Sequence, residues 1–208
     1  TNNTSTGIFT GVYNSASIHS GGIVLIDSKG NLNNRGDIQA AAYVDLDSWN
    51  NLTNTGNIIS ENDNVILQAT NGVINGVENG NTGNITAQKE ILLTSYKGNV
   101  VNYGSMTSTN SSVSLTAAGV YETANNNNHD IVNNITNTGS ITAAQKVLLR
   151  TVNGSIDNRN QITSQNSTVT IKAEKHSTYT GSAAVGNISN GVGNDYDTTS
   201  DITTKQGI

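Results

Sequence analysis

Aliphatic and polar residues alternate along most of this chain, in short runs that recur about every twenty residues. The recurring unit is an aliphatic residue, then Asn, then Gly, then a second aliphatic residue at fixed spacing. Its copies are VYNSASI (12–18), LNNRGDI (32–38), LTNTGNI (52–58), VNYGSM (101–106), ITNTGSI (135–141) and IDNRNQI (156–162). Self-similarity at such a period predicts stacked structural repeats.

Each repeat contains three short runs of period two, which indicate β-strands rather than helices. In the second repeat these runs centre on Ile38 and Ala40, then on Val44 and Leu46, and then on Leu52. The pattern predicts an all-β fold, a right-handed parallel β-helix (solenoid) with three short strands per coil of about 20 residues and about seven coils. The right hand follows because crossovers between parallel strands are overwhelmingly right-handed.

The Asn of the repeated unit is its most regular position. Stacked coils would place these side chains above one another, so that each amide can donate to the next and fix one corner of the coil. The predicted structural Asn ladder consists of Asn14, Asn34, Asn54, Asn81, Asn102, Asn137 and Asn158.

The repeat pattern also predicts where the β-helix begins and ends in the sequence. Residues 1–172 form the β-helix, with extra loops at about 70–82 and 117–134, whereas 173–208 read as an irregular or extended segment or the start of another repeat type. Because the chain begins and ends in repeat-like sequence, we expect an interior segment of a longer protein.

Composition narrows the function classes. The chain has 208 residues, no Cys, no Pro, 12% charged residues and a formal net charge of −5. This balance gives no electrostatic basis for nucleic-acid binding, and no apolar stretch is long enough for a membrane-spanning helix. The absence of Pro suits central strands that donate hydrogen bonds to both neighbours.

The sequences NTGNITAQKEILLTS and NTGSITAAQKVLLRT resemble the repeats of filamentous haemagglutinin, over about residues 12–172. That family comprises large exoproteins of Gram-negative two-partner secretion, which include adhesins and contact-dependent growth inhibition effectors. The resemblance implies a secreted or cell-surface location, export through an outer-membrane two-partner secretion transporter and display as a filament. Neither an Asn-Pro-containing secretion motif nor a toxin signature is found in the chain.

The two insertions are the first place to look for binding, because insertions in solenoids often gather on one face. We expect both to leave the same corner, two coils apart. The candidate binding residues at that corner or in its loops are Trp49, Tyr96, Tyr121 and His129. Exposed aromatic residues suit glycans or protein receptors, although such loops are often excursions without a partner.

Other chemistry is weakly supported by the sequence. Asp27 and Asp47 share an outward position in adjacent coils, with Asp45 nearby, but two carboxylates are too few for a dedicated calcium site. His19, His129 and His176 have no zinc or triad spacing. We therefore expect no metal, no cofactor and no catalytic residue.

Three functions remain open. The first is a structural and adhesive filament segment that attaches to a host-cell receptor or glycan. The second is the receptor-recognition segment of a contact-dependent growth inhibition effector, which would bind a bacterial surface. The third is a polysaccharide-active β-helix enzyme, which would need carboxylates and basic residues gathered on one face, where this chain has Thr, Ser, Asn and Gln.

Overall fold

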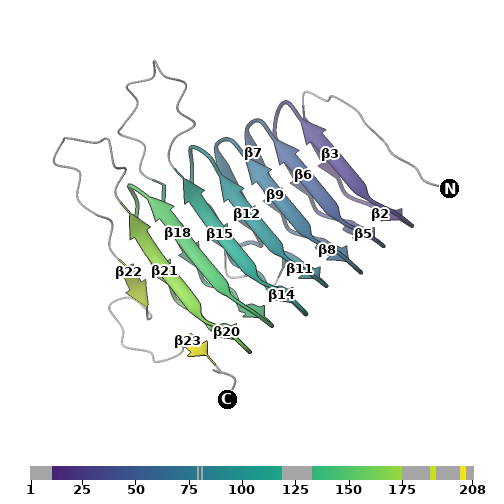
Figure 1. Ribbon diagram of the computed structural model, residues 1–208. Coiled ribbons are helices and arrows are strands. Elements are labelled where there is room, and N and C mark those ends of the chain that lie inside the picture. The colour runs from purple at the N-terminus through teal and green to yellow at the C-terminus, as the bar shows by residue number, and fades with distance from the viewer. Residues whose placement is uncertain are drawn as a thin grey trace, which may run out of the picture.

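The computed structural model of the protein describes residues 11–78, 80, 82–118, 133–174, 188–190 and 202–204. These residues form three sheets of parallel strands that run along one axis. The coils are stacked on this axis, and the chain contributes one strand to each sheet per coil (Figure 1). We number the sheets 1, 2 and 3 in the order of the chain, and we name each corner by the two sheets it joins. The parallel β-helix of about seven coils predicted from the sequence is confirmed, whereas its right-handed winding stays a prediction.

The strands of each sheet follow at regular intervals. Sheet 1 contains β1 (Val12–Asn14), β4 (Leu32–Asn34), β7 (Asn51–Asn54), β10 (Gly72–Asn75), β13 (Val100–Asn102), β16 (Ile135–Asn137), β19 (Ile156–Asn158) and β22 (Ile188–Asn190). Sheet 2 contains β2 (Ser17–Ser20), β5 (Asp37–Ala40), β8 (Asn57–Ser60), β11 (Asn84–Ala87), β14 (Met106–Ser108), β17 (Ile141–Ala143), β20 (Ile162–Ser164) and β23 (Ile202–Thr204). Sheet 3 contains β3 (Val24–Ser28), β6 (Val44–Ser48), β9 (Val65–Ala69), β12 (Ile91–Ser95), β15 (Val113–Ala118), β18 (Val147–Val152) and β21 (Val169–Glu174).

The inward positions of the strands form one continuous apolar core. In a typical coil, Ile58 from sheet 2, Val65 and Leu67 from sheet 3 and Val73 from sheet 1 are all fully buried. Each residue stacks on its equivalents in the coils above and below. Burial of one such aliphatic side chain stabilises the fold by roughly 1.5–3 kcal/mol, so the core supports the rod without disulfides.

The small residue at the corner between sheets 2 and 3 is Ala in some coils and Ser in others, and each of three Ser residues makes a hydrogen bond there. The Ser60 hydroxyl donates to the carbonyl of Ala42, the Ser108 hydroxyl to that of Lys89 at 2.5 Å, and the Ser164 hydroxyl to that of Gln145 at 2.7 Å. A buried hydroxyl is tolerated when it is hydrogen-bonded. These bonds therefore tie each turn to the coil beneath it.

The Gly of the repeated unit lies where the backbones of successive coils approach one another. A Cβ atom on Gly56 would lie 2.0 Å from the carbonyl oxygen of Gly36, and one on Gly139 would lie 1.8 Å from that of Gly104. Neither contact is possible for a side chain, so the recurrence of Gly reflects close backbone packing. Asn160, between β19 and β20, takes the place of this Gly.

The two insertions leave different corners, which corrects the sequence prediction that they share one. Residues 76–83 connect β10 to β11 at corner 1–2, whereas residues 119–134 connect β15 to β16 at corner 3–1. The first insertion begins and ends with Gly76 and Gly83, at φ of 93° and 86°. A Cβ on Gly83 would lie 2.2 Å from the amide nitrogen of Gly76, so both ends of this loop require glycine.

Part of the segment 173–208 continues the β-helix. Ile188 pairs with Ile156 in sheet 1, and Ile202 pairs with Ile162 in sheet 2. The irregular reading of this segment is therefore wrong for β22 and β23, which add an eighth rung to two sheets. The sequence signal was present in β22, because Ile-Ser-Asn at 188–190 repeats the aliphatic-x-Asn of the earlier coils.

Candidate functional site

The side-chain amides at corner 1–2 form an unbroken hydrogen-bonded ladder. In each pair the Nδ2 atom of one Asn donates to the Oδ1 atom of the Asn in the next coil, at 2.6–2.9 Å. All members are buried. The ladder consists of Asn14, Asn34, Asn54, Asn75, Asn102, Asn137 and Asn158.

One predicted member of this ladder is wrong. Asn75 holds the position between Asn54 and Asn102, and Asn81 lies outside the described residues. The physical reason is that the insertion separates the Asn from its Gly in the third coil, so the Asn-Thr-Gly at 81–83 belongs to the end of the loop. The triplet Val73-Ile74-Asn75 carries the aliphatic-x-Asn signal that could have identified the correct residue.

A second, exposed ladder joins the starts of three strands of sheet 2, β5, β8 and β11, and continues to Ser105, just before β14. The Nδ2 atom of Asn57 donates to Asp37, that of Asn84 donates to Asn57, and the Ser105 hydroxyl donates to Asn84, at 2.6–3.0 Å. The sequence analysis did not identify this ladder. It leads directly into the one groove of corner 1–2 that we consider as a site.

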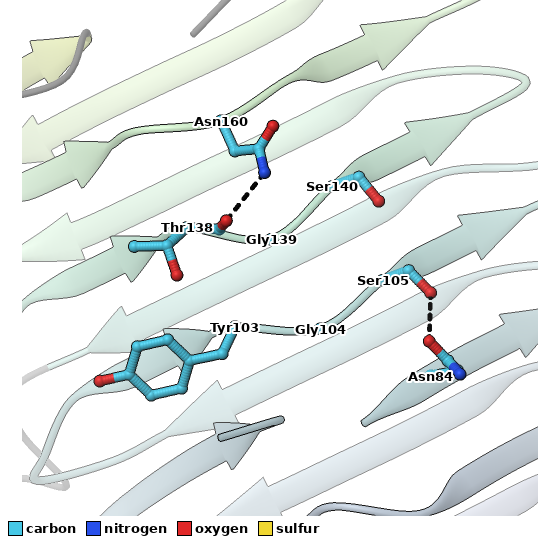
Figure 2. Close-up of a pocket in the computed structure, with 8 residues that line it drawn as sticks. All are labelled: Asn84, Tyr103, Gly104, Ser105, Thr138, Gly139, Ser140 and Asn160. Carbon is cyan, nitrogen blue, oxygen red and sulfur yellow. Dashed lines mark hydrogen bonds between the residues drawn. The ribbon is translucent and has the colours of Figure 1, made fainter. Parts of the chain in front are cut away.

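This groove has a volume of about 260 Å³ and crosses several coils at corner 1–2 (Figure 2). Figure 2 shows two adjacent turns that run side by side, Tyr103–Ser105 and Thr138–Ser140. The Asn160 amide donates to the carbonyl of Thr138 at 2.8 Å. The lining residues are Asn84, Tyr103, Gly104, Ser105, Thr138, Gly139, Ser140 and Asn160.

The chemistry of this groove is that of a neutral polar binding surface. Gly104 and Gly139 form part of its lining, where the backbones of successive coils lie in close contact. Hydroxyl groups of Thr138 and Ser140 and the ring of Tyr103 line it, a combination that can hydrogen-bond and stack on a neutral polar ligand. The residues that line it include no carboxylate, histidine or thiol.

Trp49 and Tyr96, the aromatic candidates that the structure describes, lie on one column of the rod at corner 3–1. Trp49 is 58% exposed, and the ammonium of Lys29 lies 5.4 Å from its ring centroid. Tyr96 lies two coils further along, about 10 Å away, and its hydroxyl donates to Gln68 at 2.7 Å. Tyr121 and His129 lie outside the described residues.

Acidic residues gather at the N-terminal end of sheet 3. Asp47 pairs in register with Asp27, and Asp45 lies two residues before Asp47 on the same strand. Burial raises the pKa of Asp45, with a further contribution from Asp47, and burial and the charge of Asp27 raise the pKa of Asp47. Among the described residues, no group of three or more Asp, Glu, His or Cys side chains could hold a metal ion.

A buried amide lies at the end of the second insertion. Asn133 is 0% exposed, and neither its Oδ1 nor its Nδ2 atom has a hydrogen-bond partner within the described part of the chain. It occupies the rung position of Gly98 and Gly154 in the neighbouring coils. An unpaired buried amide destabilises the fold, so this corner carries a local cost.

Within the described ranges no helix is long and apolar enough to cross a bilayer. Comparison of the chain with protein families, with curated proteins and with solved structures found no match. The features on which function can be argued are therefore those of the fold: a three-sided parallel β-helix with an internal amide ladder, an uncharged groove and exposed aromatic residues.

Proposed function

We propose that this chain is a structural and adhesive segment of a large secreted exoprotein on the surface of a Gram-negative bacterium. In this proposal it is exported through an outer-membrane two-partner secretion transporter and attaches to a host-cell receptor or glycan. The observation that carries the proposal is the uniform stacking of the coils, with one register maintained in all three sheets. A rod built in this way spaces its ends and carries loops and side chains at fixed heights.

The attachment surface in this proposal is corner 3–1. Trp49 leaves more than half of its surface exposed, and Lys29 orients its ring. Tyr96 lies on the same column as Trp49, and its hydroxyl donates to the side-chain oxygen of Gln68. Aromatic side chains that are fixed before binding lose little conformational freedom on contact, which favours their use as anchors for glycans or proteins.

Recognition of a bacterial receptor, as in a contact-dependent growth inhibition effector, is the second candidate. The sequence resemblance covers both kinds of exoprotein, and the same surface would serve either partner. The two proposals differ only in the cell that is bound, so one experiment addresses both.

The test is attachment of beads coated with this chain to cultured host cells and to Gram-negative bacteria. We expect the Trp49→Ala/Tyr96→Ala double variant to attach at least about fivefold less than the parent chain, because losing one interface aromatic costs on the order of 1–2 kcal/mol. Reduced binding to host cells alone supports an adhesin, and reduced binding to bacteria alone supports growth inhibition.

The matched control is Tyr13→Ala, on the outer face of sheet 1. Tyr13 is also 58% exposed, and it also lies beside a cation, with the guanidinium of Arg35 at 5.3 Å from its ring centroid. We expect this variant to attach like the parent. Attachment to either cell type that is insensitive to the double variant would refute corner 3–1 as the binding surface.

A further inference from the structure

The outer face of sheet 3 has its charges sorted by sign along the rod. The outward position that lies one residue before the end of β3 and β6 is occupied by Asp27 and Asp47. In the last two strands of this sheet, β18 and β21, the same column contains Arg150 and Lys172. Uncharged Gln68, Thr94 and Thr116 lie between them. One column therefore runs from acidic to basic.

The neighbouring outward column has four aliphatic residues among its seven positions, and the other three are Asp45, Ser114 and Thr170. Leu25, Ile66, Leu92 and Leu148 lie on it, and each is only half-buried although it points away from the core. In Figure 1 sheet 3 is the front layer, and no other described strand covers it. Aliphatic side chains on an outer sheet face leave apolar surface in water, which favours a partner.

We propose that this face is a homotypic interface on which two copies of the chain pack antiparallel. A two-fold axis parallel to the strands and centred on β12 would lay β3 of one copy over β21 of the other, and β6 over β18, because sheet 3 has three described strands on each side of β12. The two-fold preserves the direction of the strands, so each column faces its own counterpart.

This arrangement makes the charges of the first column complementary, whereas Asp45 of the second column faces Leu148. Asp27 faces Lys172 of the second copy, and Asp47 faces Arg150. At the adjacent corner position, Lys29 faces Glu174 of the second copy. This pair also has opposite charges, so it extends the pairing. Within one chain, Glu174 already binds Arg150 at 2.8 Å, so this end of the interface would form a network. Opposite charges placed in this way select a partner and its orientation.

The alternative parallel arrangement, with the axis along the rod, would lay β3 and β6 of one copy over β3 and β6 of the other, and β18 and β21 over β18 and β21. Acidic end would then meet acidic end, and basic end would meet basic end. Like charges in contact disfavour that orientation. The mutual repulsion among Asp27, Asp45 and Asp47, which take part in none of the ion pairs found among the described residues, also favours the approach of a second, basic end.

The size of the face predicts a weak association. Seven strands at about 4.8 Å spacing and about 3.3 Å per residue give a face of about 30 Å by 17 Å. The area is therefore about 500 Å² per copy, at the low end of specific interfaces. We expect a reversible monomer–dimer equilibrium that weakens with salt, with the dissociation constant rising roughly tenfold between about 50 and 500 mM NaCl.

The decisive experiment uses two charge variants in analytical ultracentrifugation. Asp27→Lys/Asp47→Lys makes both ends of the face basic, and Arg150→Asp/Lys172→Asp makes both ends acidic. We expect each variant alone to remain monomeric, and an equimolar mixture to form a heterodimer at least as tight as the parent dimer. Circular dichroism of each variant confirms that it is folded.

A second measurement reports the geometry of the pair. The chain has no Cys, so Thr94→Cys introduces a single thiol on the central strand, beside the two-fold axis. Facing sheets lie about 10 Å apart, which a short bismaleimide can span. Thr107→Cys, an outward Thr on sheet 2 of the following turn, is the matched control. We expect dimeric product from the first variant at a yield at least fivefold higher than from the second.

Two results would overturn the proposal. One is the absence of a heterodimer in the mixture of charge variants at low salt, near millimolar concentration. The other is equal cross-linking of the two cysteine variants. Neither result bears on cell attachment, which is assigned to Trp49 and Tyr96, so this inference and the proposed function fail independently.

Discussion

The Nδ2 atom of Asn102 donates to the Oδ1 atom of Asn137 over 2.7 Å, although 35 residues separate the two in the sequence. The same ladder joins Asn34 to Asn54 with the same distance across only 20 residues. An insertion of fourteen or so residues therefore changes nothing in the internal contacts of the rod. Variation in loop length is absorbed outside the stack, which leaves the surface free to diverge.

Removal of one ladder amide should destabilise the whole rod. Asn137→Ala deletes the acceptor of Asn102 and the donor to Asn158, so each of these two buried amides loses one hydrogen bond. The expected loss is on the order of 1–3 kcal/mol in the free energy of unfolding. Urea denaturation followed by far-ultraviolet circular dichroism measures it.

The control for this variant is Asn133→Ala in the same coil. Asn133 is buried to the same extent, but its amide has no partner within the described ranges. The substitution removes an unpaired polar group, so we expect a change below about 0.5 kcal/mol or a small gain. Equal losses in both variants would mean that side-chain volume, rather than the amide ladder, sets the stability of this corner.

A methyl group at the glycine column should disrupt coil stacking. Gly139→Ala would place its Cβ 1.8 Å from a backbone oxygen, and the backbone must move to admit it. The cost is about 1–3 kcal/mol or more, visible as a lower midpoint of thermal unfolding. Gly21→Ala is the comparison, because a Cβ there meets nothing within 4 Å; it should be neutral or slightly stabilising.

The two neighbouring leucines of β12 should respond differently to truncation. Leu93 is fully buried in the core, whereas Leu92 points outward and is half-buried. Leu93→Ala should cost about 2–5 kcal/mol, and Leu92→Ala about 1 kcal/mol or less. Chemical denaturation of dilute protein tests this, and similar costs for both would contradict the orientation of the strand.

The acidic end of sheet 3 should give a characteristic dependence of stability on pH. The pKa values of Asp45 and Asp47 lie above the ordinary value of 3.8, so the folded state binds protons more tightly than the unfolded chain does. This group of residues therefore destabilises the fold at neutral pH. The penalty diminishes as the pH falls through the raised pKa values towards 3.8.

Asp47→Asn tests this sign. It removes the repulsion on Asp45 and from Asp27, and we expect stability at pH 7 to rise by about 0.2–1 kcal/mol. The difference from the parent should shrink as the pH is lowered towards 4, when measured by thermal unfolding across a pH series. A difference that grows towards acid pH would show that Asp47 is stabilising as a carboxylate.

The sequence predicted most of the fold because the repeat fixes it several times over. Val44, Leu46 and Leu52 point inward as their alternation requires, since a shift of one residue would expose every aliphatic side chain of a strand. The same logic failed at the third coil. Asn81 precedes a Gly and fits the local motif, but the pairing of Val73 with Leu52 places Asn75 at the corner.

The candidate binding surface was less predictable. Loop residues bear no periodic constraint, and the sequence signal that places the first insertion at corner 1–2 is confined to the triplet Val73-Ile74-Asn75. The groove beside Tyr103 was also missed, because it is formed by turns from separate coils whose Gly and Ser residues are unremarkable individually. The sorted charges of Asp27, Asp47, Arg150 and Lys172 become visible only when the register of sheet 3 is known.

The hydrogen bonds of the Asn ladder all point in one direction, with the Asn of the earlier coil donating to the Asn of the later coil. In a chain that winds from its N-terminus, the side-chain N–H group of the last ladder Asn would donate to the carbonyl oxygen of the Asn in the incoming coil. Each added coil would thus be oriented by the preceding coil as its strands pair. Assembly in this sense would be templated, with one direction along the rod.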